Sequence, residues 1–243
     1  MNIKRNSKEL FIRFKLNRLT DPLDRFFLKL IYLGRFSRYV NKASKGVMFN
    51  DFYTAGHDYK KYFQLFDHVL KSEGLSGPLD YLEFGVFKGA SIQWWLKNNR
   101  HTQSKFYGFD TFEGLPEDFG MFKKGMLSAE GKLPETNDVR CTFVKGLYQS
   151  SLQNFLKTYN SSNRKVIHID CDLYSSTLYV LTSIAPFLTI GDIVIFDEFL
   201  TPTQEFKAFD DFISAYYFKF ELIGAVNNYY QSAFRLIGLP PQS

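Results

Sequence analysis

The pattern of hydrophobic positions changes near residue 79. Before this point, as in residues 58–73, apolar residues recur at helical spacing and predict helices. After it, short apolar runs alternate with helical segments, which is the pattern of a parallel sheet with crossover helices. The predicted strands are 79–85, 104–110, 140–145, 164–170 and 191–197, and the predicted helices are 90–98, 149–158, 174–187 and 204–216.

The end of the chain departs from this alternation. Residues 218–226 and 229–238 are two strand-like runs joined by Asn227 and Asn228, which predicts an antiparallel hairpin. A parallel sheet that ends in such a hairpin differs from the dinucleotide-binding folds.

The beginning of the chain is helical in pattern and has no strand-like run. Residues 1–46 predict two or three helices, interrupted near Pro22. We therefore expect a helical extension and cap over residues 1–76, followed by an α/β domain over residues 77–243.

Acidic side chains stand where four of the predicted strands end. The carboxyl ends of parallel strands meet at one edge of the sheet, and in open α/β sheets ligands bind there. We therefore expect these acids to surround one site for a cationic or polyhydroxylated ligand. They are Glu83, Asp110, Asp170 with Asp172, and Asp197 with Glu198.

The turn after the first strand contains glycines but is not a G-x-G-x-x-G motif. Gly85 would let a ligand approach the backbone, and Gly89 would let the next helix start close to the strand. Glu83 would repel a pyrophosphate but suits an ammonium group, and Asp110 can accept hydrogen bonds from ribose hydroxyls. An amino acid and a ribose in one molecule indicate S-adenosylmethionine.

A long segment, residues 111–138, separates the second and third predicted strands. It contains four glycines and two prolines and is too long for a simple connection. We expect it to cover the ligand site.

Composition fits one folded unit in the cytoplasm. The chain has 243 residues, of which 45% are hydrophobic, and no apolar run approaches the length needed to span a bilayer. Charged residues interrupt the first fifteen positions, so no signal-peptide core is present there. Cys141 and Cys171 lie in strand-like runs and are expected to be free, buried thiols.

The charge of the chain is concentrated at its beginning. Residues 1–46 carry twelve Lys or Arg and three Asp or Glu, a charge of +9, whereas the remainder carries −4. Apolar residues such as Phe11, Phe26 and Phe27 are interleaved with these charges. We expect this arm to pack in a homodimer whose partner helps close the site. The alternative is docking on an anionic membrane, which would place the protein at the inner membrane face. No nucleic-acid-binding motif accompanies the charge.

Four strings resemble, in order and spacing, the class I S-adenosylmethionine-dependent methyltransferases. They are LEFGVFKGASI, FYGFDTFEGLPEDF, HIDCDLYSSTLYVL and GDIVIFDEF. They are most similar to the macrocin/mycinamicin O-methyltransferase-like family, which acts on sugar hydroxyls of antibiotics and related glycans. The resemblance covers about residues 79–237 and implies a doubly wound, seven-stranded Rossmann-like sheet.

The resemblance also assigns residues to the cofactor and to a metal. It implies that Glu83, Gly85, Gly89 and Ser91 surround the methionine portion, Asp110 the ribose, Thr111 and Phe112 the adenosine and Gly146 the adenine, with Asp170 beside them. The family holds a divalent ion, usually Mg²⁺, and the matching positions are Asp170, Asp197 and Glu198. Glu198 departs from the family pattern, which has Asp or Asn there, and shifts the carboxylate by about one bond length.

The expected chemistry is methylation of a hydroxyl group on a sugar or polyhydroxylated small molecule. A metal would stabilise the developing alkoxide, and Asp170 would accept its proton. His168 shares the strand face of Asp170 and is either a second catalytic group or a hydrogen-bonded core histidine. Asp172 and Tyr174 are expected to contact the acceptor, although Tyr174 could equally be a packing residue. The alternatives are a metal-free methyltransferase acting on O or N, and a non-catalytic binding module.

Overall fold

A seven-stranded sheet forms the centre of the molecule. The computed structural model describes residues 2–47, 49–50 and 55–241. The strand order is β3-β2-β1-β4-β5-β7-β6; the first five strands are parallel, and β7 runs antiparallel to β5 and β6. This arrangement confirms the predicted doubly wound sheet with its terminal hairpin. The strands are β1 (Leu79–Phe84), β2 (Lys105–Asp110), β3 (Cys141–Lys145), β4 (Arg164–Ile169), β5 (Ile193–Phe196), β6 (Lys219–Val226) and β7 (Gln231–Gly238).

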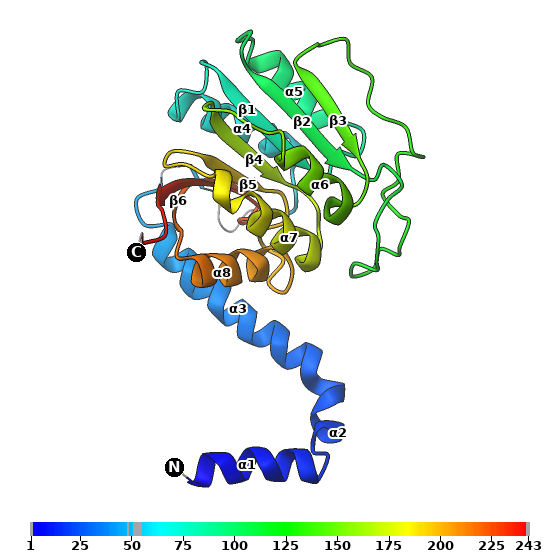
Figure 1. Cartoon of the computed structure of the whole chain (residues 1–243). Helices are drawn as coiled ribbons and strands as arrows, with labels where there is room; N and C mark the ends of the chain where they lie inside the picture. Colours follow the sequence, from blue (N-terminus) through cyan, green and yellow to red (C-terminus); the bar gives the residue numbers. More distant parts are fainter. Residues whose placement is uncertain (1, 48, 51–54, 242–243) are drawn as a thin grey trace.

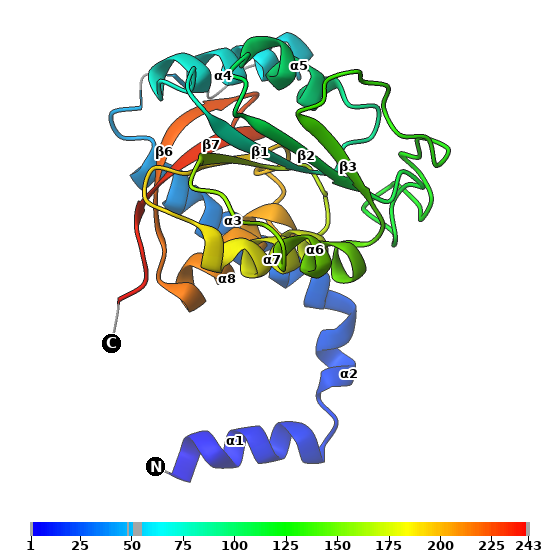
Figure 2. The same cartoon turned by 45° about the horizontal axis from the view of Figure 1, so that its top comes forward.

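Helices cover both faces of the sheet. Figure 2 shows α4 and α5 on one face and α6, α7 and α8 on the other. The helices are α1 (Asn2–Arg13), α2 (Asn17–Thr20), α3 (Asp24–Ala43), α4 (Tyr59–Ser72), α5 (Ala90–Asn98), α6 (Tyr148–Leu156), α7 (Tyr174–Ile184) and α8 (Glu205–Tyr216), with the 3-10 helices η1 (Asp21–Leu23) and η2 (Ala185–Phe187).

The central strands are buried on both faces, which explains their uninterrupted apolar runs. Every residue of β1 and of β5 is buried. One side packs against α4 and α5 through residues such as Phe66 and Trp95, and the other packs against α7 and α8 through residues such as Phe209. Charged residues are therefore displaced to the strand ends, where the site forms.

The hairpin turn uses a backbone conformation that asparagine tolerates. Asn227 and Asn228 have φ angles of 53° and 59°. Asn adopts this left-handed region more readily than most residues, which is why the pair joins β6 to β7.

The amino-terminal arm is only partly attached to the α/β body. Tyr32, Phe36 and Val40 of α3 are buried, and Phe36 packs edge-on against Phe206 of α8. The outer part of α3, with α2 and α1 beyond it, extends away from the body (Figure 1). α4, which the sequence grouped with the extension, packs against β6 and β7. Within the described ranges, no helix is both long and apolar enough to cross a membrane.

Candidate active site

A cavity of about 700 Å³ opens at the carboxyl edge of the parallel strands. This is the size of a small-molecule site. It is lined by Tyr59, Gly85, Phe87, Asp110, Thr111, Gly114, Leu115, Pro116, Glu117, Phe122, Leu127, Gly146, Leu147, Tyr148, Gln149, Asp170, Cys171, Asp172, Ser175, Ser176, Asp197 and Glu198.

Gly85 lets the end of β1 approach the end of β4. Its φ is +97°, and a Cβ atom there would lie 1.7 Å from the carbonyl oxygen of Asp170. No side chain fits in that space. The close approach observed here is that of the Asp170 backbone, and approach of a ligand to Gly85 stays a prediction.

Asp110 ties the first turn to the end of β2. Its Oδ2 accepts hydrogen bonds from the backbone N–H groups of Val86 (2.9 Å) and Phe87 (2.7 Å). Its Oδ1 accepts from the N–H of Phe112 at 2.8 Å. A carboxylate offers about four lone-pair positions, so some capacity remains for a ribose hydroxyl. Asp110 therefore shapes the turn and faces the cavity at once.

The structure brings part of the predicted cofactor set to the cavity and places the rest behind it. Gly85, Asp110, Thr111, Gly146 and Asp170 line the cavity. The other four do not, because they belong to the packing around it. Gly89 begins α5, where a Cβ would meet Pro134 of the covering segment at 2.8 Å; Phe112 is buried beside Phe143; Ser91 hydrogen-bonds Tyr62; and Glu83 lies within the sheet.

Glu83 is buried between the sheet and the α4–α5 layer. It is 1% exposed, and burial raises the pKa of its carboxyl well above the usual range. Its Oε2 has no hydrogen-bond partner among the described residues. A role for Glu83 beside an ammonium group stays a prediction.

His168 is a buried histidine held between two tyrosines. The Tyr81 hydroxyl lies 2.8 Å from Nδ1, and the Tyr62 hydroxyl lies 3.1 Å from Nε2. Burial lowers the pKa of His168 to about 3, so the ring is neutral. It points into the α4 side of the sheet and does not line the cavity, the placement of a core histidine.

Four predicted carboxyl groups line the cavity and interact electrostatically as two pairs. Asp170 pairs with Asp197, and Asp172 pairs with Glu198. Burial raises the pKa of Asp197 to about 6, and burial together with neighbouring negative charges raises the pKa of Asp172 to about 6 and that of Glu198 to about 8. Burial and Asp197 raise the pKa of Asp170 well above its usual range. Burial thus favours the protonated form of these carboxyl groups more than water does.

The acids offer the right atoms for a metal but are not arranged around one. Carboxylate oxygens are the ligands that Mg²⁺ prefers, and Glu198 Oε2 is buried without a hydrogen-bond partner in the described chain. However, among the residues whose positions are described, no group of three His, Cys, Asp or Glu side chains is placed to hold a metal ion.

Glu205 is a fifth buried acid of this cluster, and the sequence analysis missed it. It begins α8, and its Oε2 accepts a hydrogen bond from the N–H of Glu198 at 2.9 Å. An acid in the first turn of a helix is ordinarily explained by the helix dipole, so its position gave no sign of the site.

Aromatic and histidine side chains near the start of α4 form one wall of the mouth. Tyr59 lines the cavity, and His57 packs against both Tyr59 and Tyr230, with ring centroids 4.7 and 5.3 Å apart. The charge of His57 lowers the pKa of Asp197. Tyr230 donates a hydrogen bond to Glu198 at 3.0 Å. Their link to the site depends on the tertiary fold, so no local sequence signal marks them.

Residues 111–138 cover the cavity, as their length suggested. Leu115, Pro116, Phe122 and other residues of the segment line it. Glu117 accepts a hydrogen bond of 2.9 Å from Ser175 at the start of α7, which fastens the cover to the opposite wall.

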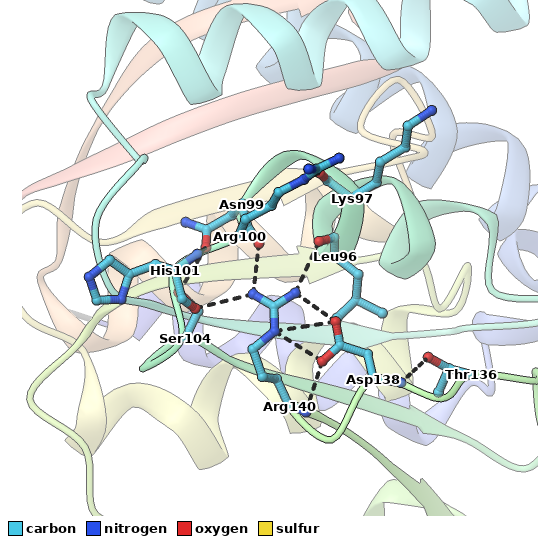
Figure 3. Close-up of polar contacts among 9 residues, drawn as sticks. All are labelled: Leu96, Lys97, Asn99, Arg100, His101, Ser104, Thr136, Asp138 and Arg140. Carbon is cyan, nitrogen blue, oxygen red and sulfur yellow. Dashed lines mark hydrogen bonds and ion pairs between the residues drawn. The ribbon is translucent and has the colours of Figure 1, made fainter.

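The far end of the cover is fixed by Arg140 (Figure 3). Its guanidinium binds Asp138 through Nε and Nη2, the shorter contact being 2.7 Å. It also donates to the carbonyl groups of Leu96, Asn99 and His101. This network fixes the end of the covering segment at the point where β3 begins.

The two predicted acceptor residues separate in the structure. Asp172 lines the cavity, with a φ of 58°. Tyr174 does not line it: its hydroxyl donates to Asp211 at 3.1 Å, and the Lys207 ammonium lies 3.8 Å from its ring centroid. Tyr174 thus packs α7 against α8.

Comparisons with known proteins agree with this geometry. Residues 82–199 match the family model for a methyltransferase domain. The calicheamicin methyltransferase CalS11 is 20% identical with a TM-score of 0.57, over 73% of this chain and 80% of that one. The O-methyltransferase NovP is 19% identical with a TM-score of 0.56, over 74% and 80%. A CmcI complex with Mg and SAM is 16% identical with a TM-score of 0.52, over 74% and 72%. No curated protein matches significantly.

At these identities the solved structures show the fold, and the family model supplies the activity. The matched segment contains Gly85, Asp110 and Asp170, the residues that shape the cavity. A non-catalytic binding module is therefore no longer needed as an alternative. Residues 82–199 of the chain thus match a methyltransferase domain, and the chain shares the fold of solved methyltransferases.

Proposed function

We propose that the enzyme methylates a hydroxyl group of a sugar or polyhydroxylated small molecule. The observation that carries this proposal is Asp170, a half-buried carboxyl that lines the cavity at the carboxyl edge of the sheet. Burial and Asp197 raise the pKa of its carboxyl, which makes the carboxylate a stronger base. The hydroxyl proton would pass to Asp170 while the new oxygen–carbon bond forms and the sulfur–carbon bond breaks. The names of CalS11 and NovP, a natural-product methyltransferase and an O-methyltransferase, support an oxygen acceptor.

The charge of the cavity narrows the acceptor class. None of the described residues that line it is Lys, Arg or His, whereas six are Asp or Glu. Such a cavity repels anions and favours neutral or amine-bearing acceptors. CalS11 is described as a TDP-rhamnose 3′-O-methyltransferase. A diphosphate acceptor of that kind would find no cationic side chain in this cavity, so we propose a hydroxyl acceptor without phosphate.

The proposal includes a divalent cation held by Asp170, Asp197 and Glu198. Support comes from their hard oxygen atoms, from the buried Glu198 Oε2 and from the Mg–SAM complex of CmcI. When bound, such a cation would stabilise negative charge on the acceptor oxygen. A bound cation would stabilise the ionised form of these carboxyl groups, so Mg²⁺ should raise the melting temperature of the wild type and leave that of Asp197→Asn unchanged.

The metal-free alternative has its own observation. His57 stands beside Asp197 at the mouth, and its neutral imidazole form could accept the hydroxyl proton without a metal. Full activity in excess EDTA, together with loss of activity in His57→Gln, would favour it. The variant Glu198→Asp is informative as well. Activity that is retained in Glu198→Asp supports a role of this side chain as a metal ligand, whereas activity that is lost only in Glu198→Gln supports a role of its negative charge.

The proposed function is tested by methyl transfer from labelled S-adenosylmethionine to a set of sugars and polyhydroxylated natural products. Asp170→Asn should reduce turnover by about 10²–10⁴-fold while it keeps cofactor affinity. Asp118→Asn, an exposed acid of the cover outside the cavity lining, is the matched control. Methylation of nitrogen instead of oxygen, or full activity of Asp170→Asn, would contradict the proposal.

A further inference from the structure

The outer part of α3, residues 24–33, exposes a dense group of large apolar side chains. Phe26, Phe27, Leu28, Leu30, Ile31 and Leu33 are between 39% and 58% exposed. In both views this part of the helix lies beyond the α/β body, with α2 and α1 attached to its end (Figures 1 and 2). Apolar patches of this density mark interaction surfaces.

These side chains lie on the side of α3 that faces away from its own body. The body-facing side is marked by Tyr32, Phe36 and Val40, which are buried at intervals of four residues. At about 100° per residue, Arg25 and Lys29 lie on the same side of α3 as these buried residues, but closer to the amino-terminal end of the helix. The apolar side chains point elsewhere, so the body of the same chain does not cover them.

The spread of the apolar positions favours a protein partner over a flat surface. At about 100° per residue, they span roughly 220° of the circumference of the helix. A lipid surface contacts one side of a helix, whereas another helix with its neighbours can enclose a wider arc.

The charges beside the apolar stretch are complementary to those of a second, antiparallel copy. Residues 26–33 are centred between residues 29 and 30. Asp24 and Arg35 lie at equal distances from that centre and on the same side of the helix, because eleven residues make roughly three turns. In an antiparallel pair, Asp24 of the partner subunit therefore lies beside Arg35, and symmetry repeats the contact. Arg35 also binds Asp210 of its own chain at 2.8 Å.

We infer that a second copy of the chain covers the outer part of α3 through an antiparallel, twofold-symmetric contact. The twofold axis passes between residues 29 and 30 of each α3. This pairing directs each basic α1 toward the other subunit, whose residues 47–243 carry a net charge of −4. In this arrangement the basic α1 helices of the two subunits lie apart from each other.

Disulfide trapping tests the register. In a Cys141→Ser background, Leu30→Cys places the two new thiols next to the twofold axis, and mild oxidation with copper phenanthroline should link most chains into dimers. Ser37→Cys is the matched control on the same helix. The antiparallel register separates its two copies by about 22 Å along the axis, so it should not link. Equal linking at both positions, or none at position 30, would overturn the inference.

Light scattering tests the assembly itself. The wild type should have twice the chain mass of 28.4 kDa. Phe27→Asp combined with Ile31→Asp should give a folded monomer, with an unchanged near-UV circular dichroism spectrum. Ile190→Asp, at a residue that is 57% exposed on the body, should remain dimeric. A monomeric wild type that binds phosphatidylglycerol vesicles and is released by salt would overturn the inference in favour of a membrane surface.

Discussion

Asp110 holds the turn after β1 with both of its carboxylate oxygen atoms and also lines the cavity. Three backbone N–H groups already bind it, which explains why the turn after β1 keeps its shape without a ligand. The rule that acids at parallel strand ends face the ligand identified Asp110 from the sequence alone. The same rule predicted that Glu83 faces the ligand, but Glu83 is still paired within β1 and does not line the cavity.

We expect Asp110→Ala to weaken S-adenosylmethionine binding by roughly 1.5–3 kcal/mol, the range for a hydrogen bond to a charged group. Asp110→Asn keeps the shape of the side chain and should lose less. Isothermal titration with folded variants measures the difference. Unchanged affinity in Asp110→Ala would remove this residue from the cofactor site.

Gly85→Ala should destabilise the protein by more than about 1 kcal/mol, because the new methyl group collides with the Asp170 carbonyl at a positive φ. Gly77→Ala is the control, since a Cβ at Gly77 would meet no described atom within 4 Å and its φ is not in the left-handed region. Urea unfolding of the two variants gives the comparison. Equal stabilities would show that the turn relaxes more easily than its geometry indicates.

At the scale of elements, the strands and helices were predictable because burial on both faces of a parallel sheet leaves uninterrupted apolar runs. The order of the strands along the chain, and the hairpin at its end, followed from the same pattern. The direction of the arm could not be predicted, because the periodicity of α3 is the same whichever way the helix leaves the body. The partners of His57 and Glu205 could not be predicted either, because they come from different elements that the fold brings together.

The cover should depend on Arg140 as an anchor. Arg140→Lys keeps the positive charge but cannot make the forked contacts with Asp138 and three backbone carbonyls, and we expect a loss on the order of 2–3 kcal/mol in unfolding free energy. Exchange of the cover's backbone amides with deuterium should become faster as well. Lys132→Arg, an exposed cation of the same segment, is the control. Slow exchange in Arg140→Lys would show that the cover is held elsewhere.

At the scale of the whole molecule, charge is segregated between a basic arm and an acidic cavity. A net charge of +9 for residues 1–46 and of −4 for the remainder follows from the sequence. Only the folded chain shows that the acids converge and that Lys and Arg are absent from the described cavity lining. This segregation is the physical reason for expecting neutral or amine-bearing acceptors.

A phosphorylated form of any accepted sugar should therefore be a poorer substrate than its neutral form, by about tenfold or more in kcat/KM. The difference should narrow as salt is added, because ions screen the repulsion. Paired kinetic assays at low and high ionic strength measure this effect. Preference for the phosphorylated form would contradict the acceptor class proposed here.

The central claim is that the acidic edge of this sheet binds S-adenosylmethionine and uses Asp170 for transfer and not for binding. Calorimetric titration of the wild type and of Asp170→Asn with S-adenosylmethionine, each with and without Mg²⁺, tests it most directly. We expect one cofactor per chain and similar cofactor affinity in both proteins, with an effect of Mg²⁺ in the wild type alone. Absence of cofactor binding by the folded wild type would contradict the claim.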